Sequence, residues 1–110
     1  MRGAVEWKTL LSSELTPTES LSAGIARIRP GEELAEHRHA EPEIYIVLSG
    51  IATITIDGAV HQAEPGTAVF IPGDSLHSCR NEHPGEVRFV YCFPTGSTSE
   101  VTYHFESEPD

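Results

Sequence analysis

Short stretches of alternating apolar and polar residues, each closed by turn residues, limit the folds open to this chain. Residues 24–29 (GIARIR) alternate with period two and stop at Pro30-Gly31. Asp57-Gly58 is the strongest hairpin signal in the sequence. No window combines helical spacing of apolar residues with start and stop caps. Short strands at even intervals predict an all-β sandwich or barrel. Further strands are expected at 43–48, 52–56, 59–62, 67–71, 76–80, 86–93 and 101–105.

The length of 110 residues suits one domain. We expect an N-terminal arm over 1–22, which could supply an edge strand at a dimer interface, a barrel over 23–105 and an acidic tail over 106–110. A core of this size is modest, and a second subunit would bury more apolar surface. A homodimer is therefore expected.

The charge balance limits the partners. Seventeen acidic residues against seven Lys and Arg give a net charge of −10. Nucleic acid and anionic membrane surfaces bind clustered basic residues, so neither is an expected partner. Cys79 and Cys92 form no CxxC motif, and Met1–Leu11 contains no long apolar run. Two reduced cysteines and no signal peptide or membrane span indicate a cytoplasmic protein.

Four side chains have the chemistry and spacing of a metal site. His37 and His39 are two residues apart and share one face if they lie on a strand, and Glu43 and Tyr45 continue this face. His77 follows a later turn. Imidazole and carboxylate ligands suit one divalent transition metal, namely Mn, Fe, Co, Ni, Cu or Zn. His37, His39, Glu43 and His77 would fill four octahedral positions and leave two for water, substrate or dioxygen, which is typical of a catalytic site.

Two segments resemble the two motifs of the cupin family. They read Gly31-x5-His37-x-His39-x3-Glu43-x6-Gly50 and Gly66-x5-Pro72-x4-His77-x3-Asn81. One position departs from the pattern, because Asp74 stands where the second motif usually has Gly. The resemblance implies a double-stranded β-helix, or jelly-roll barrel, with the metal inside it.

The reaction is less constrained than the site. Lys8 is the single lysine and lies near the N-terminus, so Schiff-base chemistry is not expected, and no motif for an organic cofactor occurs. The run His-x-His-x3-Glu-x-Tyr resembles the single-cupin lyases that cleave dimethylsulfoniopropionate to dimethyl sulfide and acrylate. This resemblance implies β-elimination on a small carboxylate, with Tyr45 as base or metal-side donor and Tyr103 as a second candidate. Tyr45 could equally serve packing, and a tyrosine placed like Tyr103 is more often a core residue than a catalyst.

Two further functions stay open. The site could belong to a metal-dependent dioxygenase of the quercetinase or diketone-cleaving type, which needs a roomy apolar pocket. The chain could instead be a non-catalytic module that binds a small ligand or a metal. The barrel itself does not discriminate between them, because one fold hosts many chemistries.

Overall fold

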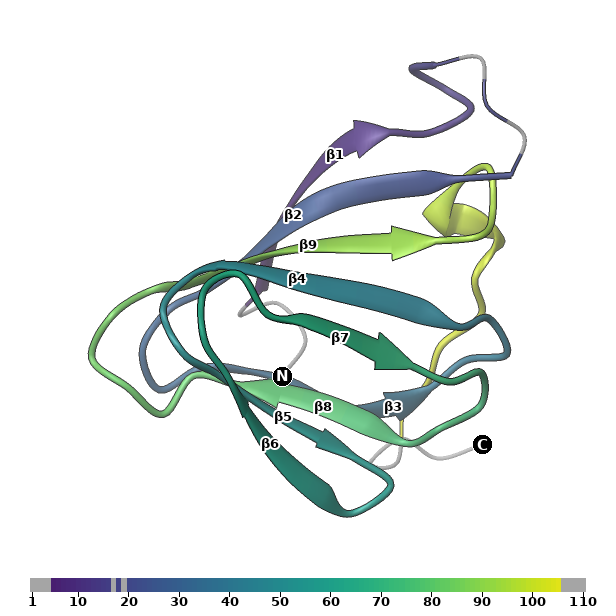
Figure 1. The fold of residues 1–110 in the computed structure, drawn as a ribbon. Helices are drawn as coiled ribbons and strands as arrows, with labels where there is room; N and C mark the ends of the chain where they lie inside the picture. Colours follow the sequence, from purple (N-terminus) through teal and green to yellow (C-terminus); the bar gives the residue numbers. More distant parts are fainter. Residues whose placement is uncertain (1–4, 17, 19, 106–110) are drawn as a thin grey trace.

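A computed structural model describes residues 5–16, 18 and 20–105, and its regular structure is almost entirely β (Figure 1). The first four residues of the expected arm and the expected acidic tail over 106–110 lie outside the described residues. The strands are β1 (Val5–Leu11), β2 (Ser22–Ile28), β3 (Glu33–Arg38), β4 (Glu43–Ser49), β5 (Ala52–Ile56), β6 (Ala59–Ala63), β7 (Ala68–Ile71), β8 (His77–Arg80), β9 (Val87–Phe93) and β10 (His104–Phe105).

The strands form two five-stranded antiparallel sheets that face each other (Figure 1). The first sheet has the order β1-β2-β9-β4-β7, and the second has the order β10-β3-β8-β5-β6. Consecutive strands such as β3 and β4 lie in different sheets, which is the connectivity of a jelly roll. The all-β jelly-roll class expected from the sequence is confirmed. β1 lies at the edge of the first sheet and pairs with β2 of its own chain.

The core fills the space between the sheets, and the two-residue period of the strands determines which side chains enter it. Every second residue of β2 and of β9 is buried, and those between them are partly or fully exposed. Tyr45 and Phe89 are among the largest fully buried side chains, and their ring centroids are 4.4 Å apart. Burying a large apolar side chain contributes about 1.5–3 kcal/mol, so this inner face stabilises the barrel.

The Asp57-Gly58 hairpin forms as predicted between β5 and β6. Both residues have positive φ, 47° and 86°, which is the conformation of a type I′ turn. The Asp57 carboxylate also accepts a hydrogen bond from the Leu76 N–H at 2.8 Å, and the Asp57 N–H donates to the Leu76 carbonyl at 2.7 Å. These bonds anchor the residue that immediately precedes His77.

Two segments differ from the expected strands. β3 is a strand of its own, which the sequence pattern did not delimit. The last expected strand, 101–105, shortens to His104–Phe105 because a 3-10 helix at Thr98–Glu100 turns the chain before it. Its i→i+3 bonds run from the Glu100 N–H to the Ser97 carbonyl and from the Val101 N–H to the Thr98 carbonyl, each 3.1 Å long.

Candidate metal centre

The candidate ligands come from both sheets. His37 lies near the end of β3 and pairs in register with His77, the first residue of β8. His39 follows β3 directly, and Glu43 opens β4 in the opposite sheet. The expectation that one continuous face carries them is wrong, because the chain crosses between the sheets at residues 40–42, where Pro42 cannot donate to a ladder. The side chains nevertheless meet inside the barrel.

Each of the three histidines is oriented by its own backbone. The Nδ1 atom of each ring lies within hydrogen-bond distance of a carbonyl two residues away, so it carries the proton and donates. This leaves every Nε2 as a free lone pair, which is the arrangement that metal-binding histidines adopt. The Nδ1–carbonyl distances are 2.7 Å for His37 to Ala35, 2.8 Å for His39 to Glu41 and 2.9 Å for His77 to Ser75.

The ligand atoms converge on one point. The offered nitrogens of His37, His39 and His77 all lie within 4.8 Å of one another, and all three residues are buried. Glu43 Oε1 lies 3.2 Å from His39 Nε2 and 3.6 Å from His77 Nε2. These four atoms are buried and have no hydrogen-bond partner. Leaving a buried polar atom unpaired costs about 1–3 kcal/mol, so four orphaned atoms around one point fit a divalent cation.

Burial and the Glu43 carboxylate act in opposite directions on the pKa values of the cluster histidines. Burial and, to a smaller extent, the nearby His77 together lower the pKa of His37 to about 4. The His37 ring is therefore neutral near pH 7 and ready to coordinate. Burial opposes charge on His39 as well, but the Glu43 carboxylate, whose Oε1 lies 3.2 Å from His39 Nε2, outweighs this effect and raises the pKa of His39.

Two loops that carry ligands are clamped together. A Cβ atom added at Gly73 would meet the Ala40 carbonyl oxygen inside 3.0 Å, so only glycine allows this approach. The Asp74 N–H donates to the His39 carbonyl at 2.7 Å. Asp74 has φ 61°, a left-handed conformation in which Asp is tolerated after Gly. The departure from the motif at Asp74 is therefore accommodated without disturbing the ligands.

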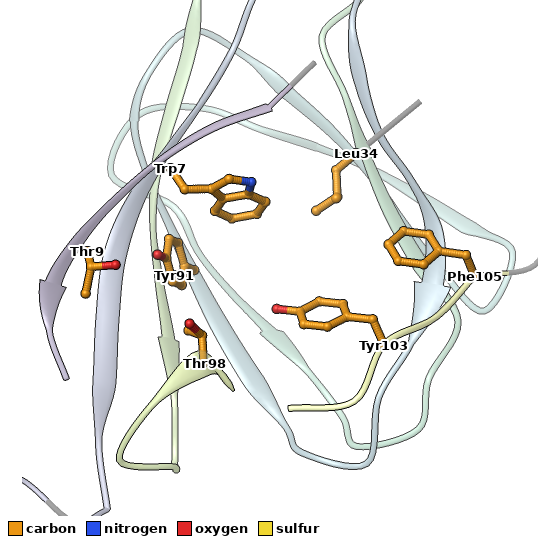
Figure 2. A pocket seen from close by; sticks show the side chains of 7 residues that line it. All are labelled: Trp7, Thr9, Leu34, Tyr91, Thr98, Tyr103 and Phe105. Atoms are coloured by element: carbon orange, nitrogen blue, oxygen red, sulfur yellow. The ribbon is translucent and has the colours of Figure 1, made fainter. Parts of the chain in front are cut away.

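Aromatic side chains line a cavity of about 510 Å³ (Figure 2), and two of them contact the ring of His37 in the cluster. The ring centroid of Tyr103 lies 5.4 Å from that of His37 and 5.3 Å from that of His39, and the ring of Phe105 lies 5.1 Å from that of His37. None of the described side chains that line the cavity is charged. Its lining residues are Trp7, Thr9, Leu34, Tyr91, Thr98, Tyr103 and Phe105.

The two sequence-predicted tyrosines occupy different positions. Tyr103 lines the cavity, whereas Tyr45 is almost fully buried, with its ring 6.4 Å from that of His77. Burial raises the pKa of Tyr45, and the charge of Glu43 and a hydrogen bond to that carboxylate add to the shift. Burial and the charge of Glu43 likewise raise the pKa of Tyr103. Both phenols thus border the cluster, one inside the core and one at the cavity.

Sequence reasoning missed the cavity residue Trp7, whereas the alternation of 86–93 places Tyr91 on an apolar face that could line the barrel. Their rings meet edge to face with centroids 5.1 Å apart. Tyr91 fits because Gly24 has no side chain, since a Cβ there would meet the Tyr91 hydroxyl inside 3.0 Å. Trp7 shares the phase of the buried Val5 on β1, and this alternation would have revealed it had β1 been recognised as a strand of the barrel.

The remaining histidines stand apart. His61 and His104 are exposed, and His83 lies 3.4 Å from the Gln62 side chain on the surface. Within residues 5–16, 18 and 20–105, His37, His39 and His77 form the single detected group of three side chains that could hold a metal. The same residues contain no helix long and apolar enough to cross a membrane.

Two facing antiparallel sheets around inward-pointing histidines define the class of small β-barrels that can hold a metal in their interior. The chain belongs to the cupin family: the model of the Cupin domain matches residues 24–93.

Individual proteins with similar sequences or structures are also known. The chain is 38% identical to dimethylsulfoniopropionate lyase DddW of Ruegeria pomeroyi over 103 residues. This match covers 94% of this chain and 67% of that protein. It is 34% identical to Protein SchB of Streptomyces halstedii over 70% of this chain and 59% of that protein. Among solved structures, the plu4264 protein of Photorhabdus luminescens is 26% identical, has a TM-score of 0.74, and the match covers 82% of this chain and 74% of that one.

Proposed function

We propose that the protein is a metal-dependent lyase that cleaves a small carboxylate by β-elimination, in the manner that the name of DddW implies. The observation that carries the proposal is the aromatic cavity, whose wall residues Tyr103 and Phe105 pack against the His37 ring of the candidate metal cluster. Such a site offers one end for an anionic group and another for a bulky or cationic group. Dimethylsulfoniopropionate has both, a carboxylate and a sulfonium.

His37, His39, Glu43 and His77 would hold the ion. A bound divalent transition metal would attract the substrate carboxylate and stabilise the negative charge that develops beside it as the α proton leaves. The rings of Trp7, Tyr91 and Phe105 face the cavity and can stabilise a sulfonium by cation–π attraction, which contributes about 0.5–2 kcal/mol per contact.

One of the two phenols that border the cluster accepts the α proton. The C–H electron pair then forms the double bond of acrylate, and the C–S pair leaves with sulfur as neutral dimethyl sulfide. Tyr103 can meet the substrate from the cavity wall, whereas Tyr45 is bonded to Glu43 and can act from the core side. The phenolate needed for this step is favoured by a neighbouring cation, which opposes the effect of burial.

Gas chromatography of the headspace over dimethylsulfoniopropionate tests the reaction. We expect dimethyl sulfide from the purified metal-loaded protein and none from His77→Ala. The proposal fails if the wild-type protein with one ion per chain releases no dimethyl sulfide.

Two phenylalanine variants separate the roles of the tyrosines. The base should lose at least about 100-fold in turnover while the protein keeps its metal, since general base catalysis contributes about 10²–10⁴-fold. If Tyr45→Phe also loses metal, Tyr45 positions Glu43 and is not the base. Tyr103→Phe then becomes the variant that must lose turnover with metal retained.

A second candidate is a metal-dependent dioxygenase. The chain is 32% identical over 63 residues to 5-nitrosalicylic acid 1,2-dioxygenase of Bradyrhizobium sp., which covers 57% of this chain and 30% of that protein. The apolar cavity could also accept a planar aromatic substrate. Oxygen uptake with salicylates, flavonols or diketones distinguishes this function from the lyase. Tight ligand binding without either reaction would favour a binding module. The homodimer and the cytoplasmic location stay predictions.

A further inference from the structure

Part of the outer surface of the first sheet, over β4 and β7, is apolar. β4 presents Ile44, Ile46 and Leu48 outwards, each at least 40% exposed, and Phe70 on the neighbouring β7 is 62% exposed. An antiparallel sheet with one face on the core normally shows a polar outer face, so this face departs from the expected alternation. The apolar side chains are also contiguous, which isolated exposed hydrophobic residues are not.

Strand register joins these residues into a grid of two rungs across four strands. One rung crosses β2, β9, β4 and β7 at neighbouring pairs, and the next rung repeats this two residues along each strand. None of the eight positions is charged. The rungs are Ile25–Val90–Ile46–Ala68 and Ala23–Cys92–Ile44–Phe70.

We infer that this grid, together with Leu48, is the contact surface of a homodimer, in which the first sheets of two copies pack face to face. The faces of two similarly twisted β-sheets are complementary in shape. Two such sheets pack face to face about 10 Å apart. A two-fold axis lets the same patch serve on both copies.

Charge favours a second copy over an unrelated partner. The chain carries a net charge of −10, so two copies repel each other through most of their surface but not through this uncharged grid. Partners that bind by electrostatic attraction would be drawn to the acidic surface instead. An apolar contact without charges is characteristic of homodimers, whose interfaces are more apolar than those of transient complexes.

The area of the apolar grid is sufficient for the central part of a dimer interface. Four strands and the span from Ile44 to Leu48 cover roughly 20 Å by 20 Å with their side chains, or about 400 Å² in projection. A stable interface buries about 800 Å² on each partner. The half-exposed Leu10 on β1 and the exposed Arg88 on β9 lie at the margin and can supply part of the polar and apolar rim.

Light scattering on the metal-loaded protein tests the contact. We expect a mass twice that of the 12.0 kDa chain, and a single-chain mass for Ile46→Glu and Phe70→Glu. Val60→Glu is the matched control, because Val60 is 58% exposed on β6 of the other sheet and should leave the dimer intact. The candidate metal ligands lie inside the barrel, away from the substituted outer surface. The metal content of each variant therefore verifies that it is folded.

Cys92 supplies a second measurement on the unmodified protein. It lies inside the grid and is partly exposed, whereas Cys79 is buried with a pKa raised by that burial to about 12 and should not react. The rate of alkylation by N-ethylmaleimide should therefore fall at least fivefold as the protein concentration rises through the dimer transition. A single-chain mass at every concentration overturns the inference. So does a dimer that survives both glutamate variants with Cys92 alkylated at a constant rate. Neither result bears on the lyase assay, which reads the inner site.

Discussion

The close approach of Gly73 to Ala40 holds together the loop that follows β3 and the loop that precedes β8, so a larger side chain at position 73 should force these loops apart. Gly73→Ala places a methyl group inside 3.0 Å of the Ala40 carbonyl oxygen, and an ordinary contact begins at 3.4 Å. The loops must therefore separate by at least 0.4 Å (3.4 − 3.0). The His39 backbone moves with its loop, because its carbonyl accepts the Asp74 N–H. Metal–ligand distances tolerate only about 0.2 Å, so the shift is large enough to impair the site.

The expected cost has two parts. Overpacking of this kind destabilises a protein by about 1–3 kcal/mol, which corresponds to a melting temperature lower by about 5–20 °C for a domain of this size. Displacing groups that orient metal ligands typically lowers metal affinity by about 10–100-fold. We expect both effects in Gly73→Ala.

Metal titration by calorimetry and thermal unfolding measure the two effects. Gly85→Ala is the control, because a Cβ at Gly85 meets nothing within 4 Å and the residue has no positive φ. If Gly73→Ala matches this control in metal affinity and in melting temperature, the loops are not clamped and the reasoning is refuted.

Two further predictions follow from the interior. Gly24→Ala should displace the Tyr91 ring and shift the fluorescence maximum of Trp7, the only tryptophan in the chain, whereas an unchanged spectrum would contradict this packing. In metal-stripped protein, the lowered pKa of His37 should make stability rise by about 3 kcal/mol between pH 4 and 6.5, because the unfolded chain binds this proton and the folded one does not. The raised pKa of His39 contributes stability that is present below pH 6.5 and lost as the pH rises through its folded value. The free energy of unfolding measured with urea should therefore be highest near pH 6.5. An unfolding free energy that does not change between pH 4 and 6.5 would contradict the burial of His37.

Local patterns predicted most of the fold. The turn at Asp57-Gly58 needs two residues with positive φ, and few pairs other than Asn-Gly or Asp-Gly provide them, so its position could be predicted from two letters. Alternation likewise predicted β2, β4 and β9 to within about two residues. The shortened β10 was not predictable, because its beginning depends on the 3-10 helix at Thr98–Glu100 and not on its own alternation.

The residues of the candidate metal site could be predicted from the sequence, but the contacts that bring them together could not. His37, His39, Glu43 and His77 meet in space, yet their convergence depends on the crossing from β3 to β4 and on the close approach of Gly73 to Ala40. Such contacts join residues far apart in the chain, and a periodic pattern does not encode them. Trp7 was missed in the cavity wall for the same reason. It reaches the cavity because β1 pairs with β2, and alternation within residues 5–11 does not by itself specify the partner strand.

The central claim is that His37, His39, Glu43 and His77 hold one divalent metal ion. Elemental analysis of the purified protein tests it most directly. The account predicts one equivalent of transition metal per chain, its loss in His77→Ala, and its retention in His83→Ala, which alters a surface histidine outside the cluster. A wild-type protein that contains no metal and whose melting temperature does not change on addition of Mn, Fe, Ni or Zn would contradict the account.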